Sequence, residues 1–225
     1  MRSRSAAAAL LVVGSLAALP ALAAQGFKFG QEEQANRAEE QARSARIAEQ
    51  LSTPCRSSLK DKKIMVLIGV RQSNGYIAAQ QQNYGPHFHA INARLRALGL
   101  RTYTPEEIRR QIAQAEIDAY FRNDPDAMLS ASRRLGASFV LRGLVASEAT
   151  RNAVINVNQV SVNMTFTLYG ADGRFIADNT ASTGSYASAN VEGMALTLVN
   201  EKADEVLPAL YADYCRNAGR KPAAH

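Results

Sequence analysis

The side chains best suited to chemistry in this sequence begin with two histidines, His87 and His89, spaced two residues apart. On a β-strand this spacing could bind a metal ion. Pro86 precedes the pair, and proline favours the first position of a helix, where side chains two residues apart diverge. No third ligand follows at a suitable spacing, so we expect ordinary polar histidines and no metal site.

Paired carboxylates are the second group that could do chemistry, as general acid and base. Glu106 and Glu107 follow a helix-start signal, and Asp124 and Asp126 flank another. Negative charge is favourable at a helix N-terminus, which explains both pairs without catalysis. The stretch 69–75 lacks the spacing of a phosphate-binding loop, and no nucleophile elbow is present. We therefore predict no catalytic residue, no cofactor and no enzymatic activity.

The N-terminus has the pattern of a secretory signal peptide over residues 1–23. Arg2 and Arg4 form a basic start, residues 6–18 are apolar, and cleavage is expected near Ala23. The residues that follow, 24–26, contain no cysteine for lipid attachment, so we expect an exported periplasmic protein without a lipobox.

Cys55 and Cys215 are the only two cysteines. Export delivers them to an oxidising compartment, where an even count favours pairing. No CxxC redox motif surrounds either residue, so a structural disulfide is expected. It would tie the start of the folded domain to its last helix.

Charge and hydropathy argue against a nucleic-acid partner and against a membrane-spanning segment. The net charge of +6 comes from 26 basic and 20 acidic residues, and loss of the two signal arginines leaves 24 basic residues, or +4. This mild excess does not indicate a nucleic-acid partner. Beyond the signal no segment approaches the roughly 18 apolar residues of a membrane span, so no direct span is expected.

The mature chain divides into three regions by composition. Residues 24–54 form a polar helical arm, since 31–50 are rich in Glu, Gln, Ala and Arg and lack Gly and Pro. The arm is either a solvated helix or one that orders against a partner. Residues 55–215 form a single domain, and 216–225 form a basic flexible tail.

The first half of the domain begins with a buried strand over 64–68, followed by a polar loop or weak helix over 71–85. Helical signals then recur with short strands between them. The predicted elements are a helix from Pro86 ending at Gly99, a strand over 100–103, a helix capped by Thr104, Pro105 and Glu107 that presents Ile108, Ile112 and Ala115, and a helix from Asp124 to Gly136.

The second half is rich in strands. Residues 160–168 alternate strictly between apolar and polar, which predicts a strand with one buried face. The other predicted elements are a strand over 139–146, a polar connection over 148–153, a bulge or bend around 158–159, a turn over 170–173, a strand over 174–183 with Phe175, Ala177 and Ala181 on one face, and a closing helix over 191–210 that kinks or breaks at Pro208.

These elements predict an α/β (α+β) fold with a mixed sheet. The sheet ends in an antiparallel three-stranded meander, helices pack on one or both of its faces, and the helical arm precedes it.

Three stretches carry a resemblance to a family of cell-envelope proteins: 99–108, 135–143 and 160–177. Residues 62–214 resemble the family that includes the curli-secretion lipoprotein, flagellar assembly protein T, the LpoB-type outer-membrane activators of penicillin-binding proteins, and the N-terminal domain of TolB. The resemblance implies a small α/β domain used for assembly or docking.

Two surfaces are candidates for binding. One is the polar strand face with Ser161, Asn163, Thr165 and Thr167, whose alternative is a plain solvated face. The other is a basic rim beside the cysteines, whose alternative is again solvated charge. The basic rim consists of Arg56, Lys60, Lys62, Lys63, Arg216, Arg220 and Lys221.

The leading functional hypothesis is a noncatalytic periplasmic protein that docks onto an envelope complex: an outer-membrane, flagellar, pilus or secretion apparatus. The second is a module that binds carbohydrate or peptidoglycan, and the third is an unrecognised hydrolase. The oligomeric state and the identity of the partner do not follow from the sequence.

Overall fold

The computed structural model describes residues 29–71, 77–79, 85–122, 124–187 and 190–218. The predicted signal peptide and the end of the basic tail lie outside these residues. The chain forms two compact units, Met1–Glu39 and Glu40–His225.

Helix α1 (Phe29–Ser52) contributes to both units. From Glu32 to Glu39, within the first unit, its side chains are exposed, and Arg37 forms an ion pair with Glu33 at 3.2 Å. In the second unit burial begins at Arg43 and recurs along one helix face at Ile47 and Leu51.

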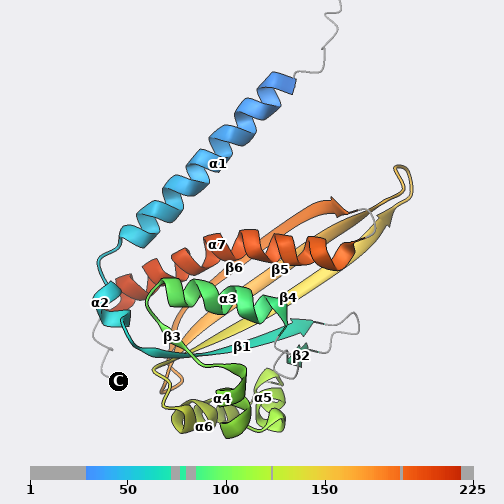
Figure 1. Ribbon diagram of the computed structural model, residues 1–225. Helices are drawn as coiled ribbons and strands as arrows, with labels where there is room; N and C mark the ends of the chain where they lie inside the picture. Colours follow the sequence, from blue (N-terminus) through green and yellow to red (C-terminus); the bar gives the residue numbers. More distant parts are fainter. Residues whose placement is uncertain (1–28, 72–76, 80–84, 123, 188–189, 219–225) are drawn as a thin grey trace, which may run out of the picture. The chain divides into compact units, whose positions relative to one another are not determined.

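A six-stranded mixed sheet forms the centre of the second unit (Figure 1). Its order is β2-β1-β4-β5-β6, and β3 pairs with the first two residues of β1, outside this order. β1 is parallel to β3 and β4, and the other pairings are antiparallel. The predicted fold class and the C-terminal meander are confirmed. The strands are β1 (Lys63–Arg71), β2 (Ile77–Ala79), β3 (Arg101–Thr102), β4 (Phe139–Asn152), β5 (Val157–Gly170) and β6 (Phe175–Ala187).

The described residues contain six further helices, and Figure 1 shows α3 and α7 side by side along the sheet, with α4 to α6 grouped apart from them. They are α2 (Arg56–Leu59), α3 (Pro86–Ala97), α4 (Pro105–Gln111), α5 (Gln114–Phe121), α6 (Pro125–Leu135) and α7 (Val191–Ala218).

The two faces of the sheet meet different helices. Leu141 shares an apolar cavity with Leu95 of α3 and Leu207 of α7. The next residue, Arg142, points to the opposite face, because side chains alternate along a strand. There its guanidinium lies 5.4 Å from the ring centre of Tyr120 in α5. We call these the helix face and the second face.

The alternation predicted for β5 is confirmed. Its apolar side chains on the helix face are 0–7% exposed, and Phe166 is fully buried. Gly143 lies opposite Phe166 in the β4/β5 register. A Cβ atom at Gly143 would come within 2.7 Å of Phe166 and of Ile68, so only glycine fits against the ring.

The sequence predicted one helix from Pro105 through Ala115. This prediction is wrong, because two helices, α4 and α5, occupy this stretch. The capping box predicted at its start is confirmed: Thr104 accepts from the Glu107 amide at 3.2 Å. The helix ends where Ile112 adopts an extended conformation, with φ −125° and ψ 124°. The Ala113 amide then donates to the Glu116 carboxylate, which starts α5.

The hairpin between β4 and β5 is longer than predicted. Residues 148–152 continue β4, and pairing with β5 runs without interruption to Asn152 and Val157. The predicted bulge at 158–159 is therefore wrong. The irregularity lies at Leu168/Tyr169, opposite Ile176 of β6. It turns Phe175 outward, so this residue is 54% exposed instead of sharing the buried face of Ala177.

Two further expectations are corrected in part. The stretch 71–85, expected to lack a strand, contains β2, and its remaining residues 72–76 and 80–84 lie outside the described residues. No break occurs at Pro208, since α7 continues to Ala218. Buried side chains on both sides of the proline, Leu207 and Leu210, hold the helix against the sheet.

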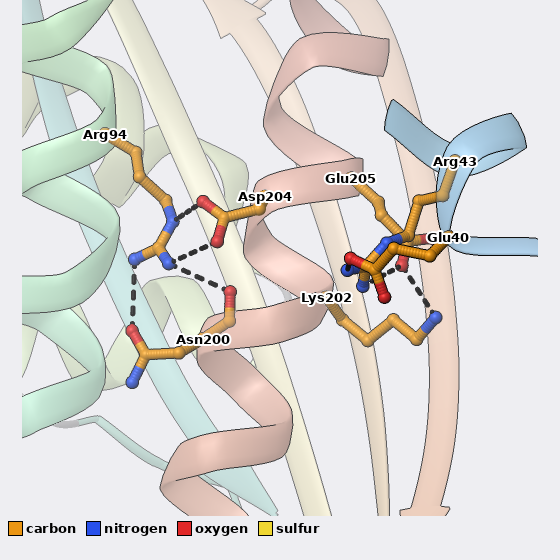
Figure 2. A network of polar contacts seen from close by, with 7 residues as sticks. All are labelled: Glu40, Arg43, Arg94, Asn200, Lys202, Asp204 and Glu205. Atoms are coloured by element: carbon orange, nitrogen blue, oxygen red, sulfur yellow. Dashed lines mark hydrogen bonds and ion pairs between the residues drawn. The ribbon is translucent and has the colours of Figure 1, made fainter. Parts of the chain in front are cut away.

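Polar contacts on both sides of α7 join it to α3 and to the second half of α1 (Figure 2). Arg94 of α3 donates to both carboxylate oxygens of Asp204, at 2.5 Å and 2.9 Å, and to the side-chain oxygen of Asn200. Arg43 of α1 lies 3.5 Å from Glu205. The bidentate pair is the stronger of the two, because its geometry is fixed at two points.

A disulfide joins Cys55 to Cys215, as the sequence predicted. It connects the residue before α2 to the last part of α7 across a separation of 160 residues. The hydroxyl of Tyr211 donates to the carbonyl of Thr53 at 2.6 Å beside it. The entry to the domain is thus fixed to its final helix.

Among the described residues, no helix has the length and apolar character needed to cross a membrane.

Candidate functional site: a groove on the second face of the sheet

Among the described residues, helices cover the second face at one end only. Arg142 of β4 is half buried beneath the rings of Tyr120 and Phe121. Two residues further on, Leu144 is also half buried, whereas Glu148 is exposed. The long meander therefore extends past α5 and leaves part of this face open.

The predicted polar face lies on this open part. Ser161 and Asn163 are exposed, and Thr165 is half buried. All three line a groove of about 470 Å³ that continues onto β6 at Ser182 and Thr183. Thr167 does not line it, because its place in the register is opposite Arg142, at the covered end.

We call this feature the sheet groove and define it by the residues that line it. They are Arg71 of β1, Leu144, Val145, Ala146 and Glu148 of β4, Ser161, Val162, Asn163 and Thr165 of β5, and Ser182 and Thr183 of β6.

The sheet groove carries one positive and one negative side chain. Arg71 pairs with Ala146 in the β1/β4 register, which places it two residues along from Glu148. Both side chains are exposed, and within the described ranges neither forms an ion pair. Their charges are available to a ligand.

The remaining polar groups offer hydrogen bonds rather than reactivity. The hydroxyls of Thr165 and Thr180 lie 3.2 Å apart across β5 and β6, so one of them donates a hydrogen bond to the other. Ser161, Asn163 and Ser182 provide further donors and acceptors. Their arrangement suits binding through neutral hydrogen bonds, flanked by the two charges.

Several groove residues were not among the predicted site residues: Arg71, Leu144, Ala146, Glu148 and Ser182. Alternation along β4 puts Leu144, Ala146 and Glu148 on one face, which is a signal that the sequence contains. Ser182 could be predicted as a groove residue only from the β5/β6 register, in which it lies opposite Asn163.

The structure brings part of the basic rim together. The Cα atoms of Cys55 and Cys215 lie 5.6 Å apart, which places their neighbours Arg56 and Arg216 in adjoining segments. Arg216 forms an ion pair with Asp213 in its own helix. Lys63 instead lies 5.7 Å from the ring centre of Tyr103. Lys60 and Lys62 are exposed, and Arg220 and Lys221 lie outside the described residues.

The two histidines occupy the start of α3, as their sequence context predicted. His89 is exposed, whereas His87 is half buried and its Nδ1 atom has no hydrogen-bond partner among the described residues. In the same part of the chain, no cluster of three or more His, Cys, Asp or Glu side chains has the arrangement of a metal site.

Burial of His87 predicts a loss of stability in mild acid. Desolvation lowers the pKa of His87 below its ordinary value of 6.5. Below pH 6.5 the unfolded chain therefore takes up a proton that the folded chain does not, and the free energy of unfolding falls as the pH drops. We expect denaturant titrations to show that His87→Leu reduces this fall.

The matched control is His89→Leu, because His89 is exposed on the same helix. It should leave the pH dependence unchanged. A slope below pH 6.5 that is the same in all three proteins would contradict the assigned burial of His87.

No protein-family model matches the chain, and no curated protein does either. Solved structures that resemble it include three bacterial proteins at low identity. The PelC dodecamer from Paraburkholderia phytofirmans has 16% identity and a TM-score of 0.37, covering 65% of this chain and 89% of that one. The LpoB C-terminal domain from Salmonella enterica has 14% identity and a TM-score of 0.39, covering 61% and 91%. A minor lipoprotein from Acinetobacter baumannii has 13% identity and a TM-score of 0.38, covering 67% and 92%.

Proposed function

We propose that the protein is a noncatalytic interaction module of a cell-envelope complex, and that it binds a protein partner in the sheet groove. The observation that carries the proposal is the groove itself, a polar hollow of about 470 Å³ on an open sheet face. The four-residue polar face expected from sequence contributes Ser161, Asn163 and Thr165 to it.

The lining of the groove favours a protein over a sugar. It combines hydroxyl and amide groups with two apolar side chains, Leu144 and Ala146, and with the separate charges of Arg71 and Glu148. A protein surface offers complements to all of these groups. Sugar sites commonly add an aromatic ring against which the sugar packs, and among the residues that the structure describes none that lines this groove is aromatic.

Two features of the chain support the proposed compartment. The signal-peptide pattern over 1–23 predicts export, and the Cys55–Cys215 disulfide is typical of an oxidising compartment. Both support a periplasmic protein that meets outer-membrane, flagellar, pilus or secretion components there.

A second candidate function is contact with peptidoglycan, which the row of Ser161, Asn163 and Ser182 favours. Hydroxyl and amide side chains hydrogen-bond readily to glycan hydroxyls and peptide amides. In this case the ligand is the cell wall itself, and binding requires no protein partner.

The two functions are separated by co-purification after mild crosslinking of the exported protein, compared with sedimentation on isolated cell-wall sacculi. We expect a stoichiometric protein partner whose retention falls at least about tenfold in Asn163→Arg, because the new side chain fills the groove. Ser147→Arg is the matched control, since Ser147 is exposed on the neighbouring strand but points to the other face.

Equal loss of the partner in both variants would contradict the groove as its site. Retention on sacculi alone, lost in Asn163→Arg, would replace the leading proposal with the second.

A further inference from the structure

β6 is an edge strand with an open side. It pairs with β5 along one side from Phe175 to Ala187, and within the described residues no strand pairs with the other. An edge of this length presents unpaired backbone N–H and C=O groups to any strand that approaches. The second half of α1 lies near the middle of β6, across a gap lined on the strand side by Asn179, Thr180 and Ala181.

The sequence of β6 lacks the side chains that usually protect an exposed edge. Natural edge strands carry lysine, proline or a central bulge that discourages pairing. The sequence of β6 contains neither lysine, arginine nor proline, and its only charge is Asp178. The bulge lies at its first residues, where Asn217 of α7 donates to the Ile176 carbonyl at 3.0 Å. From Ala177 to Ala187 the strand is regular.

Two exposed aromatic side chains mark the ends of this strand. Phe175 is 54% exposed and Tyr186 is 56% exposed. Both belong to the second face, since they lie opposite Tyr169 and Gln159 of β5. Exposed aromatic residues at such positions are enriched in protein interfaces.

We propose that β6 pairs with β6 of a second copy of this chain in an antiparallel, two-fold symmetric dimer centred on Ala181. In such an interface the same surface is used by both copies, and residues at equal distances from the centre oppose each other. Tyr186 of one copy then lies opposite the bulge at Phe175 and Ile176 of the other.

The pairing that results has no clash of charge. Thr180 meets Ser182 of the second copy, and Asp178 meets Gly184, so the two aspartates do not face each other. The aromatic residues meet at both ends of the interface, where aromatic cross-strand pairs stabilise a sheet. Ser182 also lines the sheet groove, so the dimer places the two grooves on one continuous sheet surface.

The experiment measures sedimentation of the mature chain over a range of concentrations, with cysteine trapping of the pairing. We expect a concentration-dependent dimer, and a disulfide-linked dimer in Ala181→Cys, because opposed residues of an antiparallel pair have Cα atoms about 4.5–5.5 Å apart. The native cysteines are already joined to each other and do not compete. Thr183→Cys is the control, since its two copies would be separated by four residues along the strands, about 13 Å.

A second variant tests the interface without a crosslink. Thr180→Lys combined with Ser182→Lys places like charges opposite each other, and should raise the dimer dissociation constant at least about tenfold. Ser147→Lys adds a charge to an interior strand and should leave the dimer intact. A wild-type chain that stays monomeric, or a dimer that survives the paired lysines, would overturn the proposal. Trapping as efficient in Thr183→Cys as in Ala181→Cys would overturn the two-fold register.

Discussion

Removing the Cys55–Cys215 disulfide should produce one of the largest losses of stability available in this chain. The bond closes a separation of 160 residues, and the loss of chain entropy in the unfolded state corresponds to about 5 kcal/mol for a loop of this size. In a domain of this length that change lowers the melting temperature by roughly 10–20 °C. Thermal unfolding of the oxidised protein and of Cys55→Ala gives the measurement.

The single and double variants provide the control. Either single substitution abolishes the bond, so Cys55→Ala, Cys215→Ala and the double variant should be nearly equal in stability. Two single effects that add in the double variant would show that the thiols act independently. Such additivity would contradict the role of the bond in fixing the entry of the domain to α7.

The second large effect is expected at the contact between β4 and β5. Phe166 is fully buried, and its ring fills the space that a side chain at Gly143 would occupy. Phe166→Ala should lower the free energy of unfolding by about 3–5 kcal/mol through lost burial and a new cavity. Gly143→Ala should cost about 1–3 kcal/mol, because its methyl group would overlap the ring.

The double variant tests the contact directly. With the ring removed, the methyl group at position 143 enters the space left behind, so the double variant should lose less stability than the two single losses combined. Denaturant titration of all four proteins measures the coupling. Simple additivity would contradict the register that places Gly143 opposite Phe166.

The fold was predictable wherever local pattern and tertiary burial agree. The alternation in β5 predicts its buried face, and the capping box at Thr104 predicts the start of α4, because both signals act within a few residues. The end of α4 was not predictable in this way. The change at Ile112 depends on an extended backbone and on the Glu116 side chain of the next helix, so periodicity alone joined two helices into one.

Longer-range errors have a similar cause. The polar residues 148–152 resemble a connection, yet they form a strand because β5 continues beside them as their partner. The exposure of Phe175 depends on a bulge at Ile176 that the alternating pattern does not encode. Pro208 remains within α7 because packing on both sides of it offsets the lost hydrogen bond.

The sequence predicted only part of the candidate site, because local pattern reveals a strand face but not which part of it the helices cover. Ser161, Asn163 and Thr165 follow from the strand pattern, whereas the boundaries of the groove depend on which end of the sheet α5 covers. That coverage excludes Thr167 and includes Arg71, which comes from a strand about 90 residues earlier in the chain than Ser161.

Site-specific photocrosslinking at position 163 in the exported protein tests the central claim most directly. A photoreactive residue in place of Asn163 lies within the sheet groove, and the same residue in place of Ser147 lies on the neighbouring strand facing away from it. Our account predicts one discrete crosslinked protein from position 163 and none from position 147. The same crosslinked protein from both positions, or no adduct from position 163 while the partner still co-purifies, would contradict the groove as the docking site.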